Sequence, residues 1–297
     1  MDLLVVGASG FLGRNVVECA GTSGRRVTAT YWTDTTLPDF ASQLGCDAVR
    51  YDLLGPPRAW NQDVCIYLAG NADHRRSVES PVDDLRLNAE ALNRFLASFT
   101  GGLVFMSSAA VYDGRTGRVS PAVPPNPTMP YAISKLAAER YVWHHVKQDR
   151  LAWATVLRLY YAYGRYDRAN RLIPRLVKAV LDGDGTFAVT SPRGSLLDPL
   201  WAGDVAGAAL AAAAGRAKGQ TLDLCGGHPR TIPAIVREAL DGLGSKMAIV
   251  GRTRADETPV RFHSSPERVR RSLGLETFVP FKSGIRRYLD LIGASVA

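Results

Sequence analysis

Tyr131 and Lys135 stand four positions apart in a segment that is expected to be helical. Ala, Leu, Glu and Arg dominate residues 131–149, and Pro130 comes just before them, where a proline costs no helical hydrogen bond. This spacing puts both side chains on one helix face. A nearby ammonium stabilises a phenolate and lowers a tyrosine pKa of about 10. The pair therefore predicts a proton donor and acceptor for a carbonyl/alcohol couple, against the plain alternative of a half-buried tyrosine beside a solvated lysine.

A glycine-rich turn near the N-terminus provides a context for this pair. Residues 2–6 form an apolar run typical of a buried parallel strand, and residues 11–20 read as an amphipathic helix. Between them lie glycines at a spacing of three, which let a pyrophosphate approach the main chain at a helix N-terminus. This order predicts a dinucleotide site that contains Gly7, Ser9, Gly10, Phe11, Leu12 and Gly13.

The end of the second expected strand, residues 26–31, bears on the choice between NAD and NADP. A NAD site usually places an acid there to accept from the ribose 2′-hydroxyl, but this chain has Tyr31, and its first acid is Asp34. Loss of the acid removes repulsion against a 2′-phosphate, which Arg14 could bind unless it is only a solvated helix residue. We therefore expect NADP as the cofactor, with NAD as the alternative.

Two further strand ends are expected along the cofactor. Residues 49–53 read as a strand in which Asp52 either accepts from the adenine amino group or is an ordinary turn residue, with Leu53 beside it. The strand at residues 63–68 ends in Ala69 and Gly70, which are small enough for a cofactor to lie across them.

Strands and helices alternate along most of the chain. Further strands are expected at residues 102–106, 153–159 and 221–224, with helices at 83–98 and 202–214. This alternation predicts an α/β fold with a Rossmann-type doubly wound parallel sheet, in which ligands bind beyond the carboxyl ends of the strands. Ser108 follows one such end, so its hydroxyl could bond the substrate oxygen that Tyr131 protonates. The Pro- and Gly-rich loop 113–130 could cover this site.

The pattern changes after Gly164. A basic stretch leads into a helix at residues 172–181, a hairpin at 183–192, and helices at 231–243, 266–273 and 282–292. We expect a smaller mixed α/β substrate-binding domain made of about residues 165–199 plus 227–297. The Rossmann domain would then comprise residues 1–164 plus about 200–226.

Composition narrows the range of partners. The 297 residues are 46% hydrophobic and carry a net charge of +8, but the arginines are spread out and no nucleic-acid-binding motif is present. No apolar run approaches the roughly 18 residues that span a bilayer. Four scattered cysteines indicate neither a disulfide framework nor a metal site. With no basic leader before the first strand, we expect a cytoplasmic protein without nucleic-acid, membrane or metal partners.

Taken in order, the motifs resemble the extended short-chain dehydrogenase/reductases, the branch of NAD(P)-dependent sugar epimerases, dehydratases and reductases. The resemblance rests on Gly7-x-x-Gly10-x-x-Gly13, Leu68-Ala69-Gly70, Asn88, Ser107-Ser108-Ala109-Ala110-Val111-Tyr112, Tyr131-x-x-x-Lys135, Arg158-Leu159-Tyr160-x-x-Tyr163-Gly164, Leu196 to Val205, Thr221 to Gly226 and Ser272-Leu273-Gly274-Leu275.

The resemblance implies roles for several of these residues. Ser108 would be the catalytic serine, Tyr131 the general acid/base, and Lys135 the residue that holds the nicotinamide ribose and lowers the Tyr131 pKa. Asn88 would be structural. Family members often dimerise through the two helices that correspond to residues 83–98 and 131–147, so a homodimer is expected. The cofactor site would also include Tyr31, Asp52, Leu53 and Tyr160.

Three departures from the family pattern limit the choice of reaction. Dehydratases carry Thr-Asp-Glu where this chain has Ser108-Ala109-Ala110, and alanines cannot supply the acid and base of an elimination, which disfavours a 4,6-dehydratase. Nucleotide-sugar members usually have Asn at the position of Tyr161 and Arg at that of Leu197. Arg165, Arg168, Arg171 or Arg193 could substitute for the missing pair.

The candidate substrate contacts are His74, Ser108, Tyr161 and Arg193. His74 could equally be an exposed loop residue, and the tyrosines at 160, 161 and 163 could instead pack a domain junction. The favoured function is a nucleotide-sugar 4-ketoreductase or 4-epimerase, and the lost acid at Tyr31 favours an NADPH-dependent reductase. The alternatives are an NADPH-dependent reductase of a non-nucleotide carbonyl and a non-catalytic cofactor-sensing protein, the latter disfavoured because Ser108, Tyr131 and Lys135 are all present.

Overall fold

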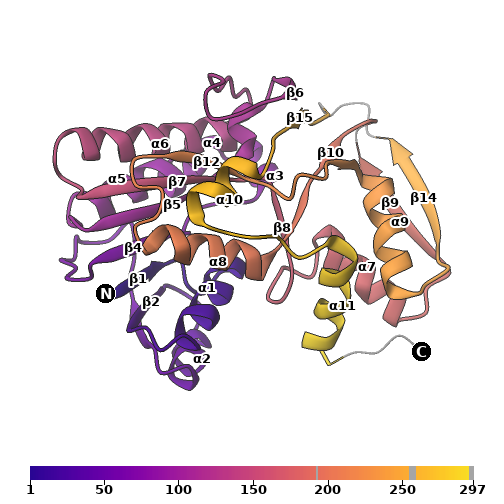
Figure 1. The fold of residues 1–297 in the computed structure, drawn as a ribbon, viewed down its shortest axis with the longest axis horizontal. Helices are drawn as coiled ribbons and strands as arrows, with labels where there is room; N and C mark the ends of the chain where they lie inside the picture. The colour runs from indigo at the N-terminus through magenta and orange to yellow at the C-terminus, as the bar shows by residue number, and fades with distance from the viewer. Residues whose placement is uncertain (192, 254–258, 294–297) are drawn as a thin grey trace.

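A computed structural model describes residues 1–191, 193–253 and 259–293. At its centre lies a parallel sheet of seven strands in the order β12-β7-β5-β4-β1-β2-β3 (Figure 1). Chain order reverses at β1, which pairs with β2 on one side and β4 on the other, so the predicted doubly wound Rossmann sheet is confirmed. Its strands are β1 (Leu3–Val6), β2 (Val27–Tyr31), β3 (Asp47–Arg50), β4 (Val64–Tyr67), β5 (Gly102–Ser108), β7 (Trp153–Leu159) and β12 (Thr221–Leu224).

Helices cover both faces of this sheet because the strands bury side chains on both. In β1, Leu3 and Val5 pack into one apolar cluster, whereas Leu4 and Val6 pack into another. The first cluster includes residues of α1 (Phe11–Gly21), α2 (Leu37–Gln43), α8 (Ala202–Ala213) and α10 (Glu267–Leu273). The second includes residues of α5 (Ala91–Leu96) and α6 (Pro130–Lys147).

The helix expected at residues 83–98 is built from several pieces. After α3 (His74–Glu79) come α4 (Pro81–Leu85), a π-helix over Arg86–Glu90, and α5. The π-helix contains Asn88, whose side-chain amide donates to Asp84 at 3.0 Å and to Ser134 of α6 at 3.0 Å. This widened turn directs Asn88 towards α6, a tertiary contact that helical periodicity does not reveal.

The remaining helices and strands form a second, smaller group. Helices α7 (Leu172–Leu181), α9 (Ile232–Leu243) and α11 (Phe281–Leu291) share one apolar cluster with Phe187 and Val189. Those two residues belong to β9 (Thr186–Ser191), which pairs in parallel with β14 (Ala248–Thr253). The predicted hairpin at 183–192 is therefore wrong over its described residues, because its strand finds its partner after α9 rather than next along the chain; Pro192 lies outside the described residues.

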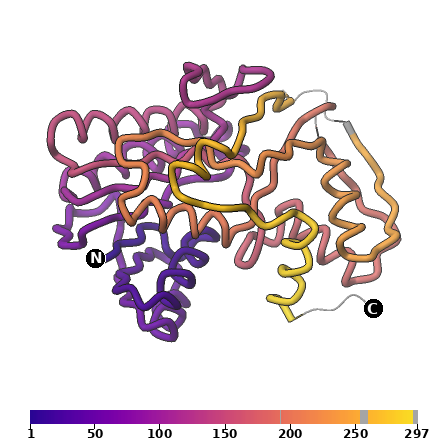
Figure 2. Tube along the Cα trace, in the orientation of Figure 1, coloured from indigo at the N-terminus to yellow at the C-terminus, as the bar shows by residue number. Residues whose placement is uncertain are grey.

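Three more pairs of short strands are present among the described residues. They are β6 (Thr116–Arg118) with β15 (Arg261–His263), β8 (Tyr161–Tyr163) with β11 (Pro199–Trp201), and β10 (Leu196–Leu197) with β13 (Arg230–Thr231). The first pair puts a strand inside the loop expected at 113–130. The trace shows the C-terminal segment crossing back over the Rossmann half through α10 before it returns to α11 (Figure 2). Among the described helices, none combines the length and apolarity needed to cross a bilayer.

Candidate active site

The three proposed catalytic residues come together at the carboxyl edge of the sheet. Ser108 is the last residue of β5, and its hydroxyl accepts from the Ala110 amide at 3.1 Å, capping a short 3₁₀-helix over Ala109–Tyr112. Tyr131 follows Pro130 in the first turn of α6, and the Ser108 hydroxyl is near enough to act on its phenol. Lys135 lies one turn further along the same face and is only 6% exposed.

Lys135 is held by the main chain of β5. Its ammonium donates to the Met106 carbonyl oxygen at 2.7 Å and lies 4.6 Å from the centre of the Phe105 ring. Burial lowers the pKa of Lys135 to about 8, and the nearby carboxylates of Glu139 and Asp84 act in the opposite direction. Lys135 is therefore mostly a cation at neutral pH.

The Tyr131 pKa moves in the direction opposite to the one expected from its spacing with Lys135. Burial raises the pKa of Tyr131, which the Ser108 hydrogen bond only partly offsets. Lys135 is not among the groups that act on this pKa, and its ammonium donates to the Met106 carbonyl oxygen. The phenol stays protonated at neutral pH, a state suited to giving a proton to a carbonyl oxygen.

A cationic and aromatic wall stands beside Tyr131. The His74 ring lies 4.6 Å from the Tyr131 ring, centre to centre. Arg171 lies over the Tyr161 ring, 4.7 Å from its centre. Burial raises the Tyr131 pKa and the Arg171 charge acts against it, whereas burial and the Arg171 charge both lower the His74 pKa. The Tyr161 hydroxyl is buried without a hydrogen-bond partner among the described residues. This wall can receive a polar substrate next to the proton donor.

The other predicted substrate and cofactor residues lie in different surroundings. Arg193 is exposed on the turn after β9. The cation beside Tyr161 is Arg171, one of the four arginines that the sequence offered as alternatives. The Tyr160 ring packs against Phe262, 5.9 Å away, in the junction between the halves. Asp52 accepts from the amide of Leu54 at 2.9 Å, a turn contact that also positions Leu53 beside it.

The glycine turn has the shape that a dinucleotide requires. Gly7 has φ +85°, and a Cβ there would lie 2.7 Å from the Ala69 amide nitrogen, while one on Gly13 would lie 2.2 Å from the Gly7 carbonyl oxygen. A Cβ on Gly70 would lie 2.3 Å from Asn88 Oδ1. The first turn of α1 contains no acidic residue, so its amides meet no competing carboxylate of their own. These residues fit a bound pyrophosphate.

An acid does stand near the end of β2, although Tyr31 occupies the usual position. The Asp34 carboxylate accepts from Arg14 at 2.8 Å, and Arg14 also donates to Thr36 at 2.6 Å. Burial acts to raise the Asp34 pKa, but these hydrogen bonds outweigh it and hold the pKa below its usual value. Arg14 is therefore paired with an anion that a 2′-phosphate would have to displace, and it is not simply a solvated helix residue.

Several groups around the site were missed from the sequence. Asp84 is buried and accepts from Asn71 at 2.7 Å, from Asn88, and from Ser134 of α6 at 2.6 Å. Glu139 lies one turn beyond Lys135 on the same face of α6 and pairs with Arg158. The series Tyr131, Lys135, Glu139 at steps of four was visible in the sequence. Nothing local marked Asp84.

Comparison with known proteins gives these features a family. The family model for the NAD dependent epimerase/dehydratase family matches residues 3–225. GDP-6-deoxy-D-mannose reductase from Pseudomonas aeruginosa is 30% identical over 154 residues, which span 46% of this chain and 44% of that relative. The chain thus matches less than half the length of this curated relative.

Solved structures cover almost the whole chain. MoeE5 in complex with UDP-glucose and NAD is 25% identical, with a TM-score of 0.85 over 99% of each chain. UDP-glucuronic acid 4-epimerase from Bacillus cereus has a TM-score of 0.85 at 19% identity over 99% of each chain, a likeness of fold. These matches confirm the resemblance to the extended short-chain dehydrogenase/reductases and identify a nicotinamide-dependent enzyme. The chain belongs to the NAD dependent epimerase/dehydratase family.

Proposed function

We propose that the protein is a nucleotide-sugar 4-ketoreductase or 4-epimerase in which Tyr131 is the general acid/base. The observation that carries this proposal is the buried Tyr131 phenol, which lies near the Ser108 hydroxyl at the end of β5 and is followed one turn later by the Lys135 ammonium. A bound nicotinamide supplies or takes up the hydride. Because the Tyr131 phenol is protonated at neutral pH, it can donate in the reduction step that both reactions share.

Each proposed residue has a distinct task. Ser108 orients the sugar carbonyl oxygen, and Tyr131 transfers its proton to that oxygen as the alcohol forms. The resulting phenolate is stabilised by the Ser108 hydroxyl and by the positive charge of Arg171. Lys135, already fixed by the Met106 carbonyl, would hold the nicotinamide ribose. Arg171 and Tyr161 would contact the substrate in place of the family's Asn and Arg pair.

The substrate class is tested by direct assay. The panel comprises GDP- and UDP-linked 4-keto-6-deoxyhexoses with NADPH or NADH, and UDP-glucose and UDP-glucuronic acid for epimerisation. Reduction of a keto sugar with exchangeable cofactor supports the ketoreductase, whereas inversion at C4 with tightly retained NAD supports the epimerase. No turnover of any nucleotide sugar, together with reduction of simple aldehydes or ketones, would contradict the proposal.

A reductase of a non-nucleotide carbonyl is the second candidate because of two residues. Tyr161 stands under Arg171 where the family has Asn, and Leu197 packs against the apolar cluster of the smaller group where the family has Arg. Thermal melting with UDP or GDP separates the candidates. A diphosphate that binds the native protein at 100 times its Kd stabilises it by about 2.7 kcal/mol, so an unchanged melting temperature would favour the second candidate.

We propose NADPH as the cofactor, with Arg14 turning from Asp34 to the 2′-phosphate. Arg14→Ala should then weaken NADPH binding about tenfold and leave NADH binding nearly unchanged, because only NADPH carries the phosphate. Asp34→Asn is the complementary variant, which should strengthen NADPH binding by releasing Arg14. Equal loss of both cofactors in Arg14→Ala, measured by calorimetric titration, would contradict this assignment and favour NAD, the cofactor in the MoeE5 complex.

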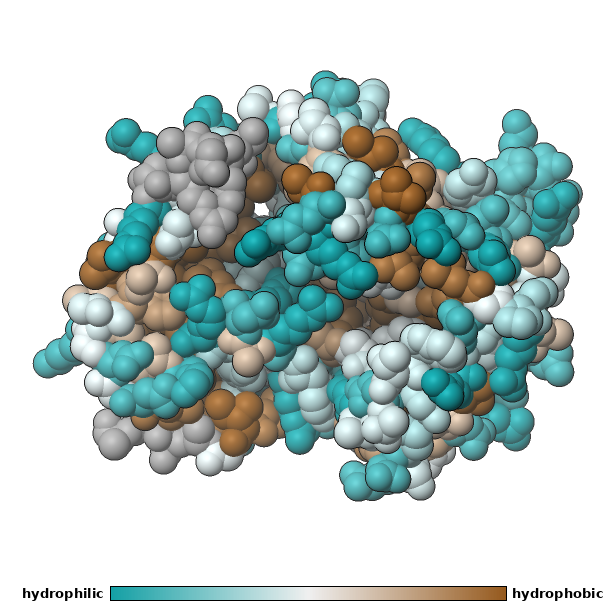
Figure 3. Space-filling model, turned by 180° about the vertical axis from the view of Figure 1, so that it is seen from behind, coloured by the Kyte–Doolittle hydropathy of each residue, from teal (hydrophilic) through white to brown (hydrophobic). Residues whose placement is uncertain are grey.

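The protein is also proposed to form a homodimer through the expected helices at residues 83–98 and 131–147, with the interface extended to α3 and the start of α4, which contact α6. Val82 and Val78 are 71% and 62% exposed, and Leu85, Ile133 and Tyr141 on the same helices are also exposed. From behind, apolar patches are visible among the hydrophilic side chains of the surface (Figure 3). Light scattering tests the proposal: Val82→Asp should yield a monomer, whereas Val260→Asp, an exposed valine elsewhere, should leave the mass unchanged.

A further inference from the structure

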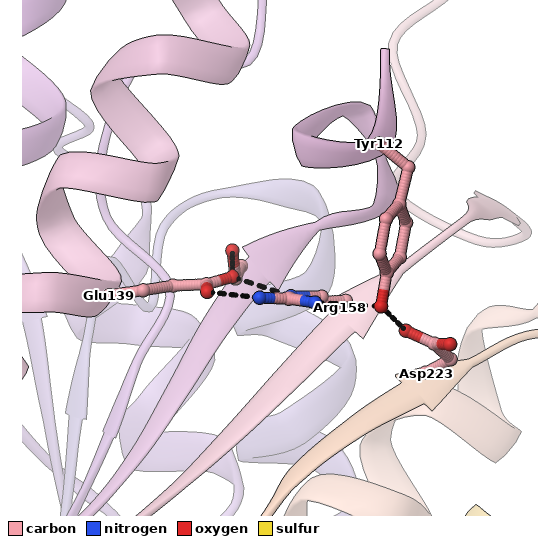
Figure 4. A network of polar contacts seen from close by, with 5 residues as sticks. Tyr112, Glu139, Arg158 and Asp223 are labelled. Atoms are coloured by element: carbon pink, nitrogen blue, oxygen red, sulfur yellow. Dashed lines mark hydrogen bonds and ion pairs between the residues drawn. The ribbon is translucent and has the colours of Figure 1, made fainter. Parts of the chain in front are cut away.

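A chain of buried polar groups begins directly behind Lys135. Glu139 is 2% exposed, and its carboxylate accepts from Ser107 at 2.6 Å and from two nitrogens of Arg158 at 2.9 and 2.6 Å. The remaining guanidinium nitrogen of Arg158 donates to the Tyr112 hydroxyl at 2.7 Å. In Figure 4 these side chains lie in one row from α6 across the sheet.

The row continues into the C-terminal segment. Tyr112 donates to Asp223 of β12 at 2.9 Å, and Ser264 donates to the other oxygen of that carboxylate at 2.8 Å (Figure 4 shows the contact between Tyr112 and Asp223). Ser264 also lies 3.0 Å from the Val119 carbonyl. It stands between β15 and α10, on the segment that crosses back from the smaller group.

This arrangement is costly unless its groups are fully paired. Glu139, Arg158 and Asp223 are all buried. The free-energy cost of removing an ion from water is offset only when the ion pair has good geometry and further hydrogen bonds. Each carboxylate oxygen in the row has a donor within 2.9 Å. These hydrogen bonds therefore join α6, β5, β7, β12 and residue 264 to one another.

We propose that Glu139, Arg158, Tyr112 and Asp223 are positioning residues that hold the Lys135 face of α6 in its working place, and that Ser264 ties this arrangement to the C-terminal segment. The inference rests on the proposed function for its kinetic readout only. Glu139 acts on Lys135 through charge as well as through placement. We call the Ser264 hydrogen bond to Asp223 the latch. Through it, the geometry of the Lys135 face of α6 (the catalytic face) depends on the docking of the segment that leads to α11.

The charged surroundings of Lys135 define the charge effect. Glu139 faces it from α6 and Asp84 from α4, and both raise its pKa. From β5 it meets the neutral Met106 carbonyl and the Phe105 ring. Arg158 on β7 lies beyond Glu139, bound to it. Removal of the Glu139 charge therefore leaves the buried Lys135 ammonium with less negative charge around it, which favours the neutral amine.

The charge effect is measured without any substrate. The chain has six lysines, of which five are exposed, so carbon NMR of lysine labelled at Cε resolves the buried Lys135. In Glu139→Gln the Lys135 pKa should fall by about one unit or more. Glu276→Gln, at an exposed glutamate, is the matched control and should leave it unchanged. Equal Lys135 titration in all three proteins would overturn the charge role.

If Glu139→Gln fails to fold, Tyr112→Phe replaces it in a test of the connection. This change deletes the hydroxyl that joins Arg158 to Asp223 and keeps the ring that packs on Phe262, 5.9 Å away. The labelled Lys135 signal should shift or broaden in a folded Tyr112→Phe protein. A Lys135 spectrum and titration identical to wild type would mean that the row does not reach the catalytic face.

The latch is tested by a pair of adjacent serines. Ser264→Ala removes the donor to Asp223, whereas Ser265→Ala removes a hydroxyl that has no hydrogen-bond partner among the described residues. Ser264→Ala should lower kcat about tenfold with cofactor affinity unchanged, Ser264→Thr should restore it, and Ser265→Ala should behave as wild type. Equal kcat for both alanine variants would overturn the latch. Altered Lys135 titration without turnover on any nucleotide sugar would fault the proposed function alone.

Discussion

Two buried polar clusters bind helix α6, which carries Tyr131 and Lys135, and the two clusters differ in their charged groups. The first, which we call the Asp84 cluster, comprises Asp84, Asn71, Asn88 and Ser134 and joins α6 to the α4–π-helix side. The second, the Arg158 cluster, comprises Ser107, Glu139, Arg158, Tyr112, Asp223 and Ser264 and joins α6 to the sheet and the C-terminal segment.

The difference lies in how each cluster balances charge. The described residues that donate to Asp84 from their side chains are all neutral, whereas Glu139 is bound by a guanidinium that no other carboxylate of its cluster contacts directly. Loss of one neutral donor leaves the Asp84 carboxylate with the others, whereas loss of the guanidinium leaves Glu139 as a buried charge without its counter-ion. We therefore expect the Asp84 cluster mainly to position Ser134, which lies beside Tyr131 and Lys135 in α6. The Arg158 cluster should contribute more to the free energy of unfolding.

The largest effect is expected from Arg158→Leu. This change leaves Glu139 buried without its cation, and an uncompensated buried charge costs about 3–5 kcal/mol. The free energy of unfolding in urea should fall by that amount. Arg140→Leu, at an exposed arginine next to Glu139, should change it by about 0.5 kcal/mol or less. If both variants lost a similar free energy of unfolding, the buried ion pair would stabilise the protein no more than an exposed arginine does.

A smaller loss is expected from Asp84→Asn. The amide oxygen can still accept one hydrogen bond, but its NH₂ group faces donors, so about 1–3 kcal/mol should be lost from the free energy of unfolding. Asp83→Asn, at the exposed neighbouring acid, serves as control. The comparison fails if Asp84→Asn costs as much as Arg158→Leu.

The smallest expected effect is the dependence of the free energy of unfolding on pH that Asp223 of the Arg158 cluster contributes. Burial raises the pKa of Asp223, although Ser264 and Tyr112 donate to it, so the folded state holds this proton to a higher pH than the unfolded chain does. Stability contributed by Asp223 therefore falls as pH rises from about 3.9 through its folded pKa. Unfolding free energies of wild type minus Asp223→Asn should decline across that window; a flat difference would show that Asp223 titrates normally.

Sequence spacing sufficed for the regular part of the molecule. The sheet, the glycine turn, Ser108 at a strand end and the shared face of Tyr131 and Lys135 follow from local patterns. The partner of β9 could not be read because parallel pairing with β14 is set by distant chain. The sign of the Tyr131 pKa shift could not be predicted either, because it is set mainly by burial rather than by residue spacing.

The central claim is that Tyr131 transfers the proton, and Tyr131→Phe tests it most directly. The measurement pairs turnover of the best nucleotide sugar with calorimetric cofactor binding in the same preparation. Loss of general acid catalysis should lower kcat by about 10²–10⁴-fold while the cofactor Kd stays within about twofold. Turnover near the wild-type level would contradict the claim and assign the proton to another group, with His74 at 4.6 Å the first to examine.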